Sequence, residues 1–320
     1  MKKQYIYAAA VIHAKENELL NKEIFEELIK IGTQEEAMAW LEEKGYDIMS
    51  AKSIEEVLMR ERVRVREVVK ELFGEVPELN LFLCETDFQN LKSAVKAVVC
   101  NQTSGFFVEG GSVLVETFEK AVNARDFKEL PKNLKIAAEK ALKMFEKTFD
   151  MGLCESVIDR IYLETIRDIS KDSDNLALKK YISLYVDLKN IFIAARGAKL
   201  NKNLEFFEVS LTGCDGFSKS SLSEVSVKGY DELLGFLSAT KYKEAASKLA
   251  ISFAEFERWM DDSLIQEIKK TGTDYFGAGA AFAYIVSKER ELFNIKLVLT
   301  VVLNGIETRV CKERLRMLYV

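Results

Sequence analysis

Apolar side chains recur every three or four residues along most of the chain, and this spacing is typical of amphipathic α-helices. The pattern predicts helices over residues 4–31, 54–73, 87–100, 132–149, 154–169, 179–199 and 307–318. The longest apolar stripe predicts one unbroken helix of about eight turns. It is formed by Tyr242, Ala246, Leu249, Phe253, Phe256, Met260, Leu264 and Ile268. We therefore expect an all-α protein.

Three stretches interrupt the helical pattern: residues 101–112, residues 201–226, and a break at residues 274–279 before the last long helix. In the first stretch, Gly110-Gly111-Ser112 is interpreted as a flexible joint that leads to a helix N-cap at Ser112, because no Gly-Lys-Ser/Thr follows. Only two prolines stand among 320 residues, so little else interrupts a helix. With 48% hydrophobic residues, the chain can bury a core large enough for two or three domains.

A short signature, an acidic residue three positions before an asparagine, occurs three times. Its members are Asp87 with Asn90, Asp187 with Asn190, and Glu291 with Asn294. The asparagines stand 100 and 104 residues apart, which is close to one third of the chain. We therefore predict three similar helical domains, over residues 1–105, 106–210 and 211–320, related by approximate three-fold symmetry.

A second element recurs upstream of each signature. It is a short predicted helix closed by an aromatic residue, and these residues are Tyr46, Phe127 and Tyr242. Each module is therefore expected to contain, in chain order, the short helix, one or two long helices and the signature helix.

The three asparagines are expected to have a structural role. Asparagine is a poor residue for a helix interior, because its amide competes for backbone hydrogen bonds. Burying an unpaired amide costs about 1 to 3 kcal/mol, so three such positions imply partners. We expect Asn90, Asn190 and Asn294 each to bond the backbone or a side chain of a neighbouring helix in its own module.

The charge balance narrows the classes of partner. A net charge of −5 and a pI of about 5.4 argue against non-specific binding to nucleic acid or to acidic membranes. The five cysteines are odd in number and widely spaced, without a Cys-x-x-Cys, as in cytosolic proteins with reduced thiols. The longest apolar stretch, residues 292–303, is well below the roughly 20 residues that cross a bilayer, so we expect a soluble protein.

Residues suited to catalysis are scarce. The single histidine, His13, rules out a multi-histidine zinc site within one chain, and no Gly-x-Ser-x-Gly or phosphate loop occurs. Asp261-Asp262 begins like the magnesium-binding run of prenyl-transfer enzymes, but Ile265 and Gln266 stand where its last aspartate would be. We expect no catalytic residue, no metal and no cofactor.

The whole chain resembles the C subunit of the V-type or archaeal A-type ATP synthase and ATPase, which is related to the d subunit of the eukaryotic V-ATPase. The resemblance is carried by the order and spacing of several motifs together with both ends of the chain. The motifs are Tyr5-Ile6-Tyr7-Ala8, Phe25-Glu26-Glu27-Leu28, Asp87-Phe88-Gln89-Asn90-Leu91-Lys92, Asp187-Leu188-Lys189-Asn190-Ile191, Asn294-Ile295-Lys296, Asn304-Gly305-Ile306 and Glu313-Arg314-Leu315-Arg316-Met317-Leu318-Tyr319-Val320.

The resemblance implies a non-catalytic coupler shaped like a funnel of three helical domains. One copy would sit at the cytoplasmic face of the cell membrane, on the rotor ring of proteolipid subunits, and receive the D and F subunits of the central shaft. It would touch the membrane only through the ring, bind no nucleic acid, and serve ATP-linked proton or sodium transport. The alternative is a helical scaffold or adaptor unconnected with rotary ATPases, which would co-purify with neither ring nor shaft.

Overall fold

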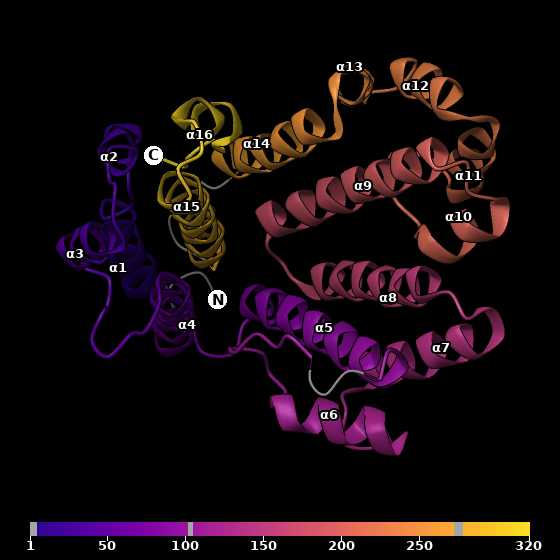
Figure 1. Ribbon diagram of the computed structural model, residues 1–320, viewed down its shortest axis with the longest axis horizontal. Coiled ribbons are helices and arrows are strands. Elements are labelled where there is room, and N and C mark those ends of the chain that lie inside the picture. The colour runs from indigo at the N-terminus through magenta and orange to yellow at the C-terminus, as the bar shows by residue number, and fades with distance from the viewer. Residues whose placement is uncertain (1–4, 102–104, 272–277) are drawn as a thin grey trace. The chain divides into compact units, whose positions relative to one another are not determined.

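The computed structural model describes residues 5–101, 105–271 and 278–320. Over these ranges the chain forms sixteen helices and no strand, so the predicted all-α class is confirmed (Figure 1). The helices are α1 (Ile6–Glu16), α2 (Lys22–Leu28), α3 (Gln34–Glu43), α4 (Ile54–Phe73), α5 (Pro77–Val99), α6 (Val115–Ala124), α7 (Lys132–Thr148), α8 (Met151–Asp172), α9 (Leu176–Lys199), α10 (Leu204–Ser210), α11 (Lys219–Lys228), α12 (Tyr230–Ser238), α13 (Lys243–Ile251), α14 (Phe253–Thr271), α15 (Gly279–Leu303) and α16 (Thr308–Arg314).

Helix ends follow the local sequence signals. Thr33 caps α3 and forms a capping box with Glu36, so two backbone N–H groups at the helix start have acceptors. Gly74 ends α4 with a positive φ of 74°, a conformation that suits glycine. Pro77 then occupies the first position of α5, where its missing N–H costs nothing.

Two predicted continuous helices are wrong, because polar residues inside them start new helices. The expected helix over residues 4–31 is divided into α1 and α2, and the side chain of Asn21 accepts a hydrogen bond from the Ile24 N–H to begin α2. The long stripe beginning at Tyr242 is divided into α13 and α14 at Ser252, whose backbone is extended at φ −169° and ψ 161°. Its hydroxyl accepts from the Glu255 N–H at 3.0 Å and so caps α14.

Other boundaries also differ from the predictions. Ser112 is not a helix N-cap: α6 begins at Val115, after Leu114. The irregular stretch 201–226 contains α10 and most of α11, and the C-terminal helix ends at Arg314 instead of residue 318. Of the break predicted at residues 274–279, positions 274–277 lie outside the described residues.

The helices group into two compact units. The first contains residues 1–79, 175–178 and 257–320, and the second contains residues 80–174 and 179–256. The predicted boundaries at residues 105 and 210 are not decided by this division, so the three-domain arrangement stays a prediction.

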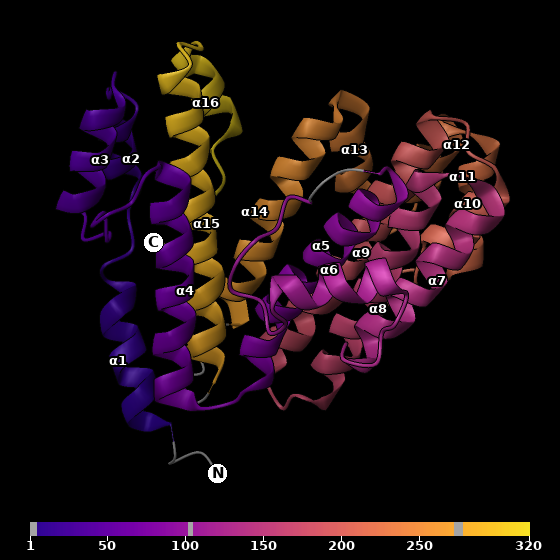
Figure 2. The same cartoon turned by 60° about the horizontal axis from the view of Figure 1, so that its bottom comes forward.

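The first unit joins both ends of the chain in one hydrophobic core. Phe25 of α2, Leu41 of α3 and Val57 of α4 share this core with Ile295 and Val298 of α15, and all five are at most 1% exposed. Both ribbon views show α4 lying along α15 (Figure 2). Burial of such side chains stabilises a fold by about 1.5 to 3 kcal/mol each, so the N-terminal helices and α15 depend on one another.

The second unit has a core of its own, built where α5, α6, α7 and α8 meet. It includes Phe88 and Leu91 of α5, Phe118 of α6, Ala138 of α7 and Ile158 of α8. None of the helices in the described part of the chain is long and apolar enough to cross a membrane.

Candidate functional site

Each signature asparagine is buried and bonds the backbone of a non-helical stretch 18 to 22 residues further along the chain. Asn90 both donates to the Val108 carbonyl and accepts from the Val108 N–H, each at 2.8 Å. Asn294 makes the same pair of bonds with Arg316, at 2.9 and 3.0 Å. The partners are backbone groups, but they lie in non-helical segments, whereas a neighbouring helix was expected.

Asn190 occupies the equivalent position with one bond fewer. Its Oδ1 accepts from the Thr212 N–H at 3.0 Å, whereas its Nδ2 has no hydrogen-bond partner within the described ranges. An amide with both groups bonded fixes the register of an extended segment, because donor and acceptor must both align. The second signature therefore holds its segment less fully than the first and third.

The acidic member of each signature accepts hydrogen bonds from a second segment. Asp87 accepts from the N–H groups of Ser112 and Val113, at 2.9 and 3.1 Å, and from the Ser112 hydroxyl. Asp187 accepts from the N–H groups of Asp215 and Gly216, at 3.0 and 3.3 Å. Bonds of this kind to a buried carboxylate are about twice as strong as neutral ones.

The third carboxylate bonds residues from the other end of the chain. Glu291 accepts from the Leu20 N–H and from the Tyr46 hydroxyl, both at 2.6 Å, and its Oε1 lies 2.6 Å from the Lys288 ammonium. Burial and the adjacent Glu291 carboxylate raise the pKa of Tyr46 well above its ordinary value, so the phenol keeps its proton and stays a donor. We call each acidic residue and asparagine, with the groups that they bond, a clamp.

The recurring tyrosines belong to the clamps, but each one bonds a signature other than the one in its own expected module. All three recurring aromatic residues are buried and follow the short helices α3, α6 and α12. The Tyr242 hydroxyl donates to Asp187 and the Tyr46 hydroxyl donates to Glu291. Tyr242 thus bonds the signature that precedes it in sequence, whereas the expected modules paired it with the signature that follows. Phe127 has no hydroxyl, and Ser112 supplies one to Asp87 instead.

Two glycines at the clamps had no assigned role at the sequence level. A Cβ on Gly216 would lie 2.5 Å from a ring carbon of Tyr242 and 2.9 Å from Asp187 Oδ2, and a Cβ on Gly111 would meet Asp87 Oδ1. Such contacts are too close for any side chain. Their position was the available signal, because each glycine falls inside one of the stretches that interrupt the predicted helical pattern after a signature helix.

Asp261 and Asp262 hold the extended C-terminal segment. Asp261 pairs with Arg290 at 3.0 Å and with Arg316 at 2.7 Å, and Asp262 Oδ1 accepts from the Met317 N–H at 2.7 Å. Burial raises the pKa of Asp262 above its ordinary value. Both carboxylates are therefore engaged within the protein, beside the segment that Asn294 also bonds.

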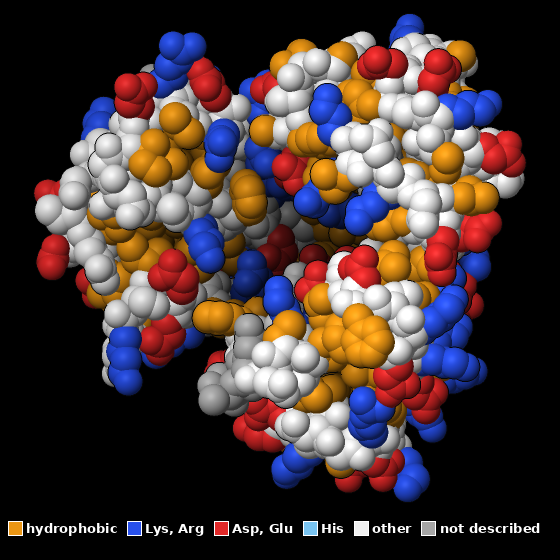
Figure 3. Space-filling view, turned by 45° about the vertical axis from the view of Figure 1, so that its right-hand side comes forward, with side chains coloured by type: hydrophobic (Ala, Val, Ile, Leu, Met, Phe, Trp, Pro, Cys, Tyr) orange, Lys and Arg blue, Asp and Glu red, His pale blue; other side chains and the backbone are white. Residues whose placement is uncertain are grey.

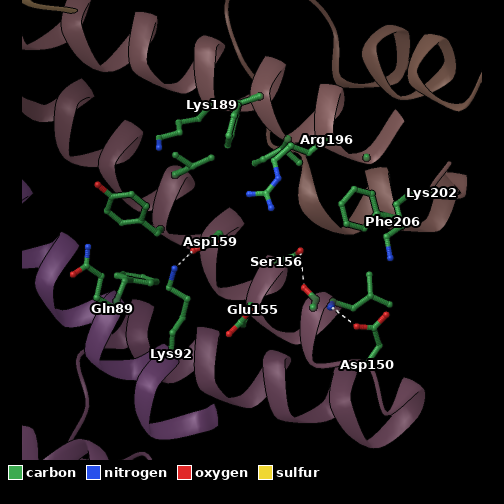
Figure 4. A pocket seen from close by; sticks show the side chains of 18 of the residues that line it. Gln89, Lys92, Asp150, Glu155, Ser156, Asp159, Lys189, Arg196, Lys202 and Phe206 are labelled. Atoms are coloured by element: carbon green, nitrogen blue, oxygen red, sulfur yellow. Dashed lines mark hydrogen bonds and ion pairs between the residues drawn. The ribbon is translucent and has the colours of Figure 1, made fainter. Parts of the chain in front are cut away.

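Among the described residues, no group of three or more His, Cys, Asp or Glu is arranged to hold a metal ion. His13 lies 2.6 Å from Glu16 on the same helix. The second unit does contain a pocket of about 540 Å³, which we call the α8 pocket (Figure 4). It is lined by residues of α5, α8 and α9, by Asp150 before α8, by Leu200 and Lys202 after α9, and by Phe206 of α10.

The repeated clamps define an all-α protein in which buried amides and carboxylates secure the segments that link its helices. A model of the ATP synthase (C/AC39) subunit family matches residues 8–314, and the chain therefore belongs to this family. The resemblance inferred from the sequence is confirmed at this level.

Several curated relatives match over most of their length. The C subunit of the A-type ATP synthase of Methanocaldococcus jannaschii is 23% identical, over 92% of this chain and 82% of the relative. The C subunit of the V-type sodium ATPase of Enterococcus hirae is 23% identical, over 97% of both chains. The C subunit of the A-type ATP synthase of Thermococcus kodakarensis is 25% identical, over 97% of this chain and 89% of the relative.

Proposed function

We propose that this chain is the non-catalytic central-stalk C subunit of a prokaryotic V/A-type rotary ATPase, where it couples the membrane rotor ring to the central shaft. The observation that carries the proposal is the family match over residues 8–314, together with relatives named as C subunits that align along nearly their whole length. In this role the chain contacts the proteolipid ring and the D and F subunits of the shaft, as one copy per complex. It lies on the cytoplasmic face of the membrane.

The clamps support a mechanical role. A coupling protein transmits torque, so the loops between its helices must not stretch when the helices are pulled. Backbone segments bonded to buried side chains resist such extension, because each bond broken leaves a buried polar group unsatisfied at a cost of about 1 to 3 kcal/mol. The three clamps place such bonds on the segments after α5, α10 and α16.

The surface is consistent with protein partners. Figure 3 shows basic and acidic side chains interspersed over the visible face, without a continuous stripe of either sign. Together with the net charge of −5, this distribution disfavours a nucleic-acid partner.

Removal of the chain from the assembled complex tests the proposal. Membranes without it should lose ATP-driven ion transport, because the ring is no longer joined to the shaft, while the detached catalytic head should still hydrolyse ATP. Adding back the purified chain should restore transport. Persistent ATP-driven pumping without the chain, or ATP turnover by the purified chain above background, would contradict the proposed function.

A further inference from the structure

The α8 pocket contains four basic and four acidic side chains, and three of the basic ones form no ion pair among the described residues. Lys92 pairs with Asp159 at 2.6 Å. Asp150 accepts from the Leu153 N–H and caps α8. Glu155 lies 3.7 Å from Lys96. Three of the four carboxylates are thus engaged inside the second unit, and Glu85 is the fourth.

The other three cations come from α9 and the segment after it. They are Lys189, Arg196 and Lys202, and no carboxylate in the part of the chain that the structure describes pairs with them. In Figure 4 the Arg196 guanidinium points into the space between α9 and α8. An unpaired charge at a partly enclosed surface attracts an opposite charge more strongly than it would in bulk water.

Each of these cations rests near an aromatic ring. Lys189 Nζ is 5.3 Å from the Tyr185 ring centroid, and Lys202 Nζ is 5.6 Å from that of Phe206. Arg196 Cζ is 5.5 Å from the Phe192 centroid. Such stacking holds a long side chain in place while its N–H donors stay free for a ligand. The wall therefore combines ordered cations with apolar area.

The rim adds an apolar contact. Leu200, which lines the pocket between Arg196 and Lys202, is 65% exposed. A row of cations and aromatic rings beside an exposed leucine is suited to a partner that offers both carboxylates and apolar side chains.

We propose that the α8 pocket receives an acidic segment of a partner protein, with carboxylates bound by Arg196, Lys202 and Lys189 and an apolar residue against Leu200. The inference rests on the proposed function in one respect, since the segment is expected on another protein of the same complex. An anionic membrane fits less well. The cations line a hollow of about 540 Å³ among helices, whereas a bilayer presents its headgroups in a plane.

Charge reversal tests the pocket. The variant Arg196→Glu with Lys202→Glu should weaken association with the rest of the complex by about tenfold or more, because like charges then face each other. A milder loss is expected for Arg196→Gln with Lys202→Gln. The matched control is Lys179→Glu with Lys180→Glu, two exposed lysines of α9 that do not line the pocket. The control should assemble like the unmodified chain, and circular dichroism melting should show all variants folded.

Cross-linking identifies the occupant. A photoreactive phenylalanine analogue at Leu200, in the assembled complex, should give a product with an acidic stretch of another protein of that complex. The same analogue at Ile251, which is 68% exposed and does not line the pocket, should not. Products with lipid alone, or none, would overturn the inference. Folded charge-reversal variants that assemble normally would overturn it as well and leave the proposed function intact. Failure of the unmodified chain to join the complex would contradict both the inference about the pocket and the proposed function.

Discussion

The Tyr46 hydroxyl donates a 2.6 Å hydrogen bond to the Glu291 carboxylate across 245 residues of sequence. The bond ties the loop after α3 to the middle of α15, beside the core that α2, α3 and α4 share with α15. Because Tyr242 makes the equivalent bond to Asp187, the relationship is a repeated one. The first unit is therefore completed by the N-terminal segment.

Loss of either tyrosine hydroxyl should destabilise the protein. In Tyr46→Phe the Glu291 Oε1 loses a buried donor, and we expect a loss of about 1 to 3 kcal/mol in the free energy of unfolding. Tyr242→Phe should lower the free energy of unfolding in the same way, because Asp187 then loses its donor. Tyr7→Phe is the control, since Tyr7 is 76% exposed and should change nothing. Chemical denaturation measures the effect, and equal midpoints for Tyr46→Phe and the control would contradict the clamp.

The asparagines should differ in their contribution to stability. Asn90→Leu and Asn294→Leu each strand one backbone N–H and one carbonyl, whereas Asn190→Leu strands only the Thr212 N–H. At about 1 to 3 kcal/mol for each stranded group, the first two should lower the melting temperature more than the third. Calorimetry on the three variants decides the order. An Asn190→Leu variant that melts lowest would refute this prediction.

The shifted pairing of aromatic residues and signatures predicts which fragments fold. A fragment of residues 80–256 contains the complete second unit together with residues 175–178 of the first, and it should unfold cooperatively on its own. Residues 257–320 lack the α2, α3 and α4 side of their core and should not. Addition of residues 1–79 should restore helicity to residues 257–320 in circular dichroism. Cooperative unfolding of residues 257–320 alone would count against the pairing.

The cysteines should differ sharply in reactivity. Burial raises the pKa of Cys84, Cys154 and Cys214 to about 12 each, so at pH 8 almost none of these thiols is ionised. Cys100 is exposed and Cys311 is buried with a raised pKa. Iodoacetamide at pH 8 should therefore label Cys100 first, as mass spectrometry of the native protein would show. Early labelling of Cys154 would be inconsistent with the structure.

Helical class and the signature positions could be predicted from the sequence, because both depend on local spacing. The apolar period predicts a helix wherever side chains three or four positions apart share a face, and the acid-x-x-Asn signature is visible for the same reason. Helix breaks were missed where a single polar side chain, Asn21 or Ser252, caps a new helix inside an apolar stripe. The cap competes with the stripe for the same backbone groups, and periodicity does not weigh that competition.

The partners of the signature were decided only by the tertiary structure. The Leu20 N–H and the Tyr46 hydroxyl reach Glu291 because α15 packs against helices from the other end of the chain. A hydrogen bond across 271 or 245 residues leaves no periodic trace, since nothing in the intervening sequence depends on it. The α8 pocket has the same origin: Lys92 and Arg196 stand on α5 and α9, and only the packing of these helices with α8 brings their charges to one pocket.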